Sequence, residues 1–455
     1  MVFRKFDIQN KTQSMKKYLL IILSGICLII SCKKDDEKWK KAAENPDFLR
    51  RTQAQVTESI IHDIFAPPVS SRIYVYASLA AYEAGIAGNP KYNSMVGQLK
   101  GFNKVYTLDS ATKICNGLAA TRAFLTIGKN LTFAQDVYIE FEKTLWEDYK
   151  KTGIPDDIYE NSIAFGDSVA ASIMNYSKKD NYKQTRGFRY TVTNQPGTWV
   201  PTPPAYMDAV EPNWMKIRSL TLDTCIQFTP PAPSKFDVTK GSPYYNEVMD
   251  SYTTVKNLTD EQRAITNFWD CNPFKMNIMG HAMFATKKVS PGGHWMGITS
   301  QVTRQQKSDL AQTVEAYLLT SISIFDGFIS CWTEKYRSAR IRPESVINAN
   351  IDKDWQPILQ TPPFPEYPSG HSVISAAAQV ALTKVLGKDV AFADSTEMAY
   401  GLPVRKFDSF FNAAQEASIS RLYGGIHFRP ALTNGFLQGE KVGNWVIAKL
   451  KTKKS

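Results

Sequence analysis

The sequence predicts an all-α protein with two helical halves, residues 46–230 and 231–455, joined by an ordered, proline-rich connection. Apolar residues recur at helical spacing, three and four apart, while the alternation typical of strands is scarce. The segments with this spacing are residues 72–88, 111–127, 131–152, 158–177, 259–270, 308–334, 370–386 and 433–449. At 455 residues, of which 43% are hydrophobic and 21% charged, the chain can bury the core of a large globular protein.

The N-terminus has the pattern of an export signal. From Met15 the chain reads MKKYLLIILSGICLIISC, with an apolar stretch of 14 residues that is too short for a membrane span of about 20 residues. Its end resembles a lipobox, which predicts a lipoprotein signal peptide at residues 1–31, a start at Met1 or Met15, and a lipid on Cys32. Residues 32–45 are interpreted as a tether.

The predicted lipid implies export and attachment to the bacterial outer membrane. The KKDDE that follows Cys32 resembles the acidic tags that direct some lipoproteins to the cell surface, and a plain solvated tether is an equal alternative. The net charge is +11, or +7 without residues 1–31, which carry five Lys or Arg and one Asp. This modest excess favours anionic substrates, and no dense basic run indicates nucleic-acid binding.

Between residues 186 and 235 the chain is rich in proline, but Trp199 and Trp214 are interspersed. A flexible linker would lack these tryptophans, so the segment is predicted to be ordered. Further on, Asp309 is predicted to cap a long buried helix that ends near Lys335. Thr259 with Gln262 fits a capping box, so the two acidic residues between them are interpreted as first-turn helix charges.

Three short segments in the last third of the chain predict an oxyanion site. They are K-x6-R-P from Lys335 to Pro343, PSGH from Pro368 to His371, and S-R-x5-H from Ser420 to His427. Two of their three cations are arginines, whose planar forks match a tetrahedral oxyanion. The cations are Lys335, Arg342 and Arg421.

The PSGH segment adds Ser369 and Gly370, a hydroxyl and a backbone N–H, at the predicted start of a helix where anions are favoured. His371 and His427 offer a nucleophile or metal ligand and a proton-transfer group. Two of only five histidines in the chain therefore fall on motif positions, which argues against a solvated basic face with unrelated core histidines.

This combination resembles the superfamily that joins vanadium-dependent haloperoxidases with type 2 phosphatidic acid phosphatases and bacterial acid phosphatases. The resemblance implies paired helical bundles. Trp332 and Phe364 resemble the aromatic pair on the halide side of fungal-type vanadium chloroperoxidases. The first hypothesis is therefore a haloperoxidase that oxidises halide with hydrogen peroxide to hypohalite and uses vanadate as cofactor.

The resemblance also implies residue roles. His427 would bind vanadium, His371 would move protons, and Lys335 would polarise the peroxide. The residues expected to hold the vanadate oxygens are Lys335, Arg342, Ser369, Gly370 and Arg421. The second hypothesis is a metal-free phosphatase, in which His427 attacks a phosphomonoester to give a phosphohistidine. The third is a non-catalytic oxyanion-binding lipoprotein. Vanadate and phosphate have nearly the same shape, so the motifs alone do not separate the first two.

One position departs from the family pattern, which continues S-R-x5-H-x3-D. Here Ala431 stands where the Asp is expected, so the partner of the second His427 ring nitrogen is open. A backbone carbonyl or Asn434 could serve. Asp270 is a candidate for bracing an active-site arginine, with a surface or capping role as the alternative.

The remaining histidines and cysteines carry no clear motif. His62, His281 and His294 lack ligand-like spacing and are interpreted as structural, although His294, in a glycine-rich segment interpreted as a loop, could approach the pocket. Four cysteines remain beyond the signal and Cys32, and they allow three disulfide pairings or free thiols. They are Cys115, Cys225, Cys271 and Cys331. Nothing in the sequence indicates an oligomeric state.

Overall fold

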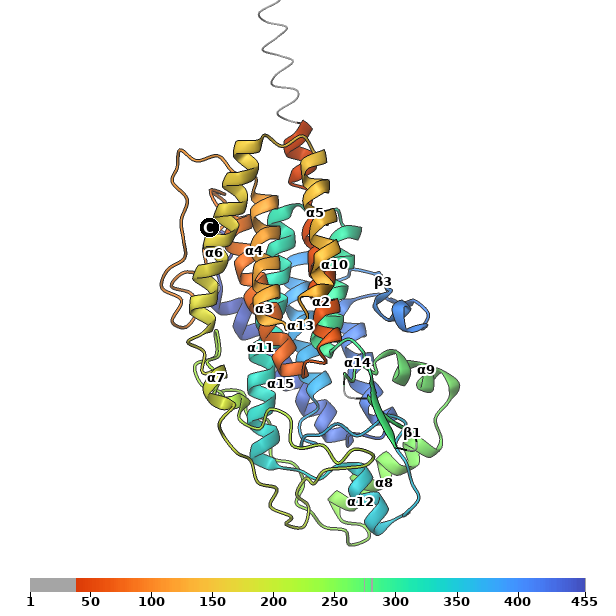
Figure 1. The fold of residues 1–455 in the computed structure, drawn as a ribbon. Helices are drawn as coiled ribbons and strands as arrows, with labels where there is room; N and C mark the ends of the chain where they lie inside the picture. Colours follow the sequence, from red (N-terminus) through yellow and green to blue (C-terminus); the bar gives the residue numbers. More distant parts are fainter. Residues whose placement is uncertain (1–37, 274, 280, 455) are drawn as a thin grey trace, which may run out of the picture.

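The computed structural model describes residues 38–273, 275–279 and 281–454, and it is mostly helical, which confirms the all-α prediction (Figure 1). The predicted signal peptide and Cys32 lie outside the described residues. The helices are α2 (Asp47–His62), α3 (Pro67–Gly85), α4 (Asn116–Leu131), α5 (Ile139–Lys151), α6 (Asp156–Ser177), α7 (Tyr182–Thr185), α8 (Pro243–Lys256), α9 (Asp260–Phe268), α10 (Pro291–Gln305), α11 (Leu310–Ser338), α12 (Pro343–Asn350), α13 (Gly370–Leu386), α14 (Phe410–Tyr423) and α15 (Arg429–Lys449). Short 3-10 helices are η1 (Asp136–Tyr138), η2 (Trp214–Lys216) and η3 (Thr396–Tyr400).

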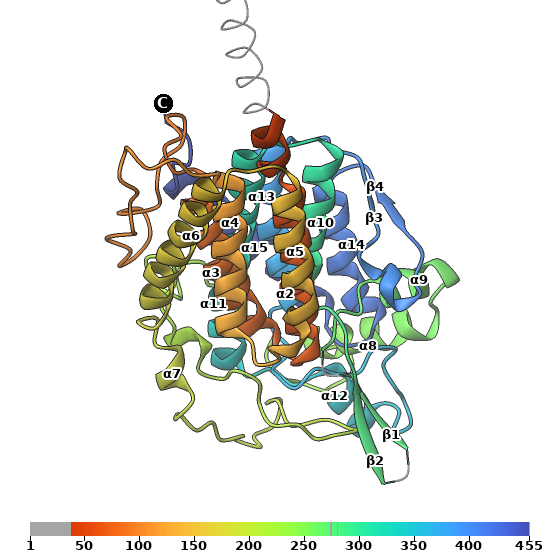
Figure 2. The same cartoon turned by 45° about the horizontal axis from the view of Figure 1, so that its top comes forward.

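Two small antiparallel hairpins complete the fold. One pairs β1 (Lys275–Met279) with β2 (Ala282–Thr286), and it projects from the body in Figure 2. The other pairs β3 (Phe392–Asp394) with β4 (Arg405–Phe407).

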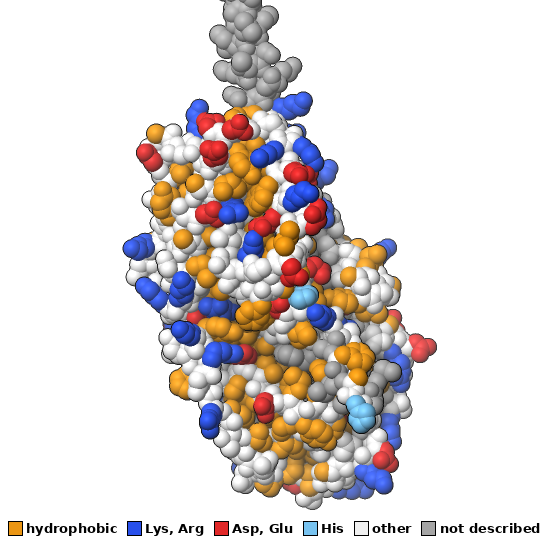
Figure 3. Space-filling view, viewed as in Figure 1, with side chains coloured by type: hydrophobic (Ala, Val, Ile, Leu, Met, Phe, Trp, Pro, Cys, Tyr) orange, Lys and Arg blue, Asp and Glu red, His pale blue; other side chains and the backbone are white. Residues whose placement is uncertain are grey.

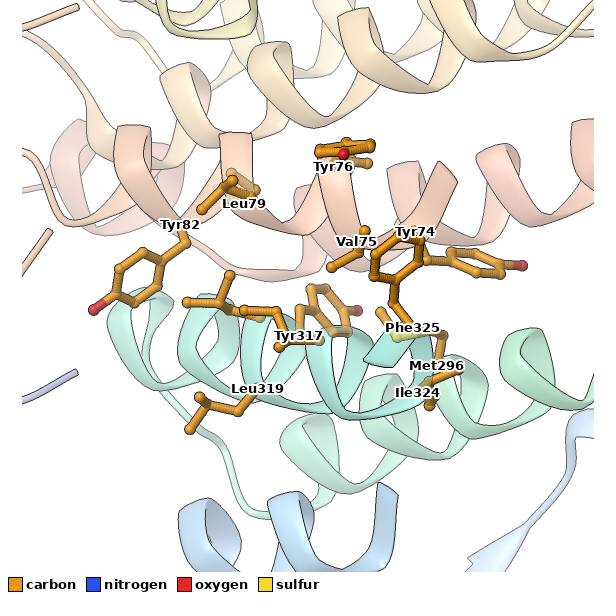
Figure 4. Close-up of a cluster of buried hydrophobic side chains, with 14 of the residues drawn as sticks. Tyr74, Val75, Tyr76, Leu79, Tyr82, Met296, Tyr317, Leu319, Ile324 and Phe325 are labelled. Atoms are coloured by element: carbon orange, nitrogen blue, oxygen red, sulfur yellow. The ribbon is translucent and has the colours of Figure 1, made fainter. Parts of the chain in front are cut away.

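The two helical halves share one hydrophobic core. In the N-terminal half α3 packs on α4, and α4 on α6, while in the C-terminal half α13 packs between α11 and α15. The halves meet where α3 lies along α11, and Figure 4 shows side chains such as Val75 and Leu79 of α3 facing Tyr317 and Phe325 of α11. This packing buries α11 on all sides and makes it the support from which the site residues project.

Helix α11 begins as its sequence predicts, because the Asp309 side chain accepts a hydrogen bond from the Gln312 backbone N–H at 2.8 Å. Of the helices that the structure describes, α11 is the one that is long and apolar enough to span a membrane. Its most apolar stretch is buried inside the protein, as in the core helix of a globular fold. The capping box of Thr259 and Gln262 is also confirmed.

The proline-rich connection is ordered, as predicted. Trp199 and Trp214 are buried, and the segment is held to the C-terminal half by backbone groups. The Val210 carbonyl accepts a hydrogen bond from Trp332 Nε1 at 3.2 Å, and Asp326 of α11 accepts backbone N–H groups from residues 220–222. The connection therefore fixes the orientation of an aromatic side chain at the site.

Three sequence-based expectations need correction. The residues up to 45 are not all tether, because residues 38–43 are helical and Glu44 accepts the Asn116 and Gly117 backbone N–H groups at the start of α4. Six helices lie outside the segments predicted as helical: α2, α7, α8, α10, α12 and α14. The glycine-rich segment around His294 is the first turn of α10 rather than a loop, because Ser290 caps it and a Cβ at Gly293 would lie 2.7 Å from the Tyr74 hydroxyl.

The surface carries charges of both signs. Figure 3 shows basic and acidic side chains interspersed over the visible face, with apolar side chains gathered over the lower part of the view. The four described cysteines are free thiols, which answers the question of pairing left open by the sequence.

Candidate active site

The three sequence motifs meet around one cavity. Lys335 lies near the end of α11, Arg342 precedes α12, and the PSGH segment opens α13. Arg421 is in the last turn of α14, and His427 lies in the turn before α15. The cavity lining includes Trp332, Phe364, Gly370, His371, Arg421 and His427. Segments up to about 90 residues apart in sequence thus form one site, as the motifs predict.

The His427 ring is held by Glu366, which the sequence analysis missed. Its Nδ1 lies 3.0 Å from Glu366 Oε1, and the same oxygen accepts the Phe428 backbone N–H at 3.0 Å. Burial, followed by the nearby Arg342 and Lys335 charges, keeps the pKa of His427 well below its usual range, so the ring is neutral. The carboxylate therefore selects the tautomer with a proton on Nδ1 and a lone pair on Nε2.

The expected alternatives to the missing aspartate are not used. The Ala431 carbonyl accepts the Ser369 backbone N–H at 3.0 Å, and the Asn434 side chain hydrogen-bonds to Tyr367. Asn434 was therefore the wrong candidate. Glu366 stands five residues before His371 in PPFPEYPSGH, so the signal was the lone acidic residue of that segment.

Replacing Glu366 by glutamine removes the negative charge that fixes the His427 tautomer. We expect vanadate affinity to fall about 10- to 100-fold, as for other partners of metal-bound histidines. Binding to the full-length protein can be measured by calorimetry. Glu334→Gln is the matched control, because Glu334 is also buried but pairs with Arg337. Equal affinities of Glu366→Gln and the wild type would contradict this role.

Both site arginines are buried and only partly hydrogen-bonded. Arg342 donates to the Phe364 and Ile426 carbonyls at 2.8 and 2.7 Å and lies 3.3 Å from His427 Nε2, but its Nη2 has no partner among the described residues. Arg421 donates to Ser420 Oγ and to the Trp269 carbonyl. Burial lowers the pKa of each guanidinium to about 10. A bound anion would offset this cost.

Lys335 is fully buried and its Nζ lies within 3.1 Å of three backbone carbonyls, those of Pro365, Glu366 and Pro368. Burial lowers the pKa of Lys335. The three carbonyl oxygens favour the protonated side chain, because the ammonium group has three N–H donors to match them. The side chain thus ties α11 to the segment before PSGH and adds positive charge to the site. A direct hydrogen bond from Lys335 to an oxyanion, as the resemblance implied, would need one of these contacts to be exchanged.

His371 faces the cavity with one ring nitrogen unpaired. Its Nε2 has no hydrogen-bond partner among the described residues, while the Trp269 carbonyl hydrogen-bonds to the ring. Burial and the Arg421 charge keep the pKa of His371 well below its usual range. The neutral ring can therefore accept a proton from a bound group. The Trp269 carbonyl orients both His371 and Arg421.

Two buried, neutral histidines predict a dependence of stability on pH. In the unfolded chain both would have pKa values near 6.5, so below that pH the unfolded state binds protons that the folded state does not. Through these two rings the free energy of unfolding should therefore fall as the pH drops from 7.5 to 5, a fall partly offset by His294 and Glu83, whose raised pKa values act in the opposite direction. In the double variant His371→Gln, His427→Gln this fall should be smaller, as measured by urea denaturation. His62→Gln, at an exposed site, should behave like the wild type.

The aromatic pair and Asp270 lie beside this charge cluster. The Trp332 and Phe364 ring centroids are 5.0 Å apart, and Lys335 Nζ lies 5.6 and 5.1 Å from them. Asp270 lines the cavity. Its charge raises the pKa of Arg421, although burial lowers that pKa by more. The ion pairs of Asp270 are with Lys288 and Lys275, at 3.0 and 3.5 Å. Asp270 therefore acts on Arg421 through its negative charge, and no direct ion pair joins the two among the described residues.

The donor set fits a vanadate ion. Arg342 Nη2 is an unpaired donor among the described residues, and the first amides of α13 have no acceptor within the helix. The His427 Nε2 lone pair accepts from Arg342 Nη1 at 3.3 Å, a contact that a bound metal would replace. Several cations surround this position, so a tetrahedral anion with one nitrogen ligand would satisfy groups that are otherwise buried without partners.

Comparisons with known proteins agree with this geometry. Residues 315–454 match the family model described as the VCPO second helical-bundle domain. The chain is similar to the solved structure of the first bacterial vanadium-dependent iodoperoxidase, with 44% identity over 90% of this chain and 97% of that chain, and a TM-score of 0.84. A search of the curated proteins returned no match.

A bacterial vanadium-dependent chloroperoxidase shares the fold at 16% identity. Its holo form matches with a TM-score of 0.64 and its apo form with 0.65, each over 85% of this chain and over 93% and 95% of those chains.

The chain belongs to the vanadium-dependent haloperoxidases. It is an oxidoreductase that uses vanadate as cofactor and oxidises halide with hydrogen peroxide to hypohalite. The first of the three functional hypotheses is thereby confirmed.

Proposed function

We propose that iodide is the halide this enzyme oxidises most efficiently. The observation that carries the proposal is the 44% identity, over nearly the whole chain, to a protein described as an iodoperoxidase. The cavity supports it, because much of its lining is apolar: Pro67, Pro291, Phe328, Trp332, Leu359, Pro362, Phe364 and Ile426. The cost of moving an ion out of water falls as its radius grows, so such a cavity admits iodide at a lower cost than bromide or chloride.

In this proposal the site residues act as follows. His427 Nε2 would bind the vanadium, while Arg342, Arg421, Ser369 and the Gly370 N–H would hold the oxygens. Bound vanadate supplies the electrophilic activation of hydrogen peroxide. His371 accepts and returns protons through Nε2, and the Lys335 charge strengthens the positive field. Trp332 and Phe364 exclude water on the halide side.

The test is a comparison of kcat/KM for iodide, bromide and chloride, with the full-length protein loaded with vanadate and supplied with hydrogen peroxide. Iodide should give the highest value and chloride the lowest. Protein without vanadate should be inactive with every halide and is the control. Chloride turnover equal to iodide turnover would overturn the proposal. Hydrolysis of an aryl phosphate by the vanadate-free protein would instead reveal a second activity of the phosphatase type.

We also propose that the enzyme is anchored to the bacterial outer membrane through lipid on Cys32. The support is the run from Met15 to Cys32, with its lysines, short apolar stretch and lipobox-like end. A fatty-acid analogue should label the wild type in cells and should not label Cys32→Ser. Release of an unlabelled wild-type protein as soluble material would contradict the anchor. Surface exposure can be tested on the same cells by protease treatment.

A further inference from the structure

A second cluster of chemically active side chains lies behind the wall of the cavity. It consists of Cys271, after α9, His294 in the first turn of α10, Asp394 in β3 and Glu397 in η3, and all four are at most 3% exposed. None of these residues belongs to the three motifs. Cys271 also lines the active-site cavity, so the cluster and the cavity share a wall.

Three of these side chains are spaced as metal ligands are. His294 Nδ1 lies 3.3 Å from Cys271 Sγ and 3.1 Å from Glu397 Oε1, and Sγ lies 3.9 Å from that oxygen. In a tetrahedral zinc site, bond lengths of about 2.0–2.3 Å place neighbouring ligand atoms roughly 3.4–3.6 Å apart. Shifts of a few tenths of an ångström would therefore bring all three atoms into contact with one cation.

The other nitrogen of His294 is held as in many metal sites. Asp394 Oδ2 lies 2.7 Å from Nε2, and its second oxygen accepts the Thr396 backbone N–H at 2.9 Å. A carboxylate on the distal nitrogen places the ring proton there and leaves Nδ1 as the ligand atom. The carboxylate–histidine arrangement thus directs the His294 lone pair toward Cys271 and Glu397.

Glu397 provides a separate observation. Its side chain is fully buried, yet Oε2 has no hydrogen-bond partner among the described residues. A buried carboxylate oxygen without a partner is costly, and a cation bound by both oxygens would remove that cost.

We propose that Cys271, His294 and Glu397 bind one divalent cation of the zinc type. Thiolate and imidazole ligands favour zinc over magnesium or calcium, and the fourth position is filled by Glu397 Oε2 or by water. Binding releases two protons to solvent, one from the Cys271 thiol and one from His294 Nδ1, and no oxidation or reduction is involved.

The cation would brace the wall that presents the Trp269 carbonyl to the active site. The Trp269 ring stacks on His294 with centroids 4.6 Å apart, while its carbonyl accepts from Arg421 and hydrogen-bonds to His371. Cys271 is two residues further along the chain. A metal that joins α10, η3 and the segment after α9 therefore fixes the position of that carbonyl.

The experiment uses the full-length protein without vanadate, so its outcome does not depend on haloperoxidase activity. After treatment with a chelator, the protein is titrated with Co²⁺. We expect one equivalent to bind and to produce a thiolate-to-cobalt absorption band, and zinc added later should displace it. Elemental analysis before chelation should show bound zinc.

The band should disappear in Cys271→Ser and persist in Cys225→Ser, a control at a half-buried free thiol. Asp394→Asn keeps the three ligands, and its cobalt affinity should fall about 10- to 100-fold. Circular dichroism identifies any variant that fails to fold. In that case Glu397→Gln is used instead, and its cobalt affinity should be lower than that of the wild type. Wild-type protein that neither contains zinc nor gives the cobalt band would overturn the proposal and leave His294 as an imidazolium paired with two carboxylates.

Discussion

Replacing His427 by alanine is expected to abolish halide oxidation and to weaken vanadate binding more than any other single substitution. The reason is geometric, because the His427 Nε2 lone pair is turned toward the site by Glu366 and the other surrounding groups are hydrogen-bond donors. The cations that remain would still attract the anion, but without a bond to vanadium. Calorimetry with vanadate and an iodide assay measure the two effects.

His62→Ala is the matched control for this variant, because that side chain is half exposed and, within the described part of the chain, hydrogen-bonds only to its neighbour Asp63. It should keep both the affinity and the rate of the wild type. If His427→Ala bound vanadate as tightly as the wild type, His427 would not be the ligand.

Replacing His371 by alanine should have a different effect, with most of the rate lost and much of the binding kept. Its unpaired Nε2 can exchange a proton with a bound group, and acid-base assistance is worth about 10²–10⁴-fold in rate. His371 is not the expected vanadium ligand, so its removal should change Kd far less than kcat. Both are measured with the vanadate-loaded variant.

The two histidine variants are most informative together. A loss of binding in His427→Ala with a loss of rate in His371→Ala supports the separate roles. Similar, small losses in both would show that neither histidine has the role assigned to it here.

Much of the site could be predicted from sequence because its residues occur in short motifs with fixed local geometry. Ser369 and Gly370 open a helix whose start is visible in the sequence, and Lys335 follows a capped, apolar run. Several long apolar helices were also predicted, whereas α10 was missed because its glycines suggest a loop, although Gly293 serves a close contact with Tyr74.

The parts that could not be predicted depend on contacts between distant segments. Glu366 and His427 are 61 residues apart, and neither the spacing nor the residue type marks them as a pair. The same holds for Cys271, His294 and Glu397, which come from three elements and meet only through tertiary packing. The sequence around His294 indicates a structural role, because no residue near it has the spacing needed to bind the same metal ion.

The position of Glu366 also affects how such enzymes should be classified. The carboxylate that holds His427 comes from the loop before α13, and Ala431 occupies the position in α15 where the family pattern has its aspartate. The same contact is therefore supplied from a different place in the chain. A search that required the aspartate after the histidine would discard this protein despite its intact site. Membership is better judged by whether a carboxylate reaches Nδ1 in space than by the residue found at one aligned position.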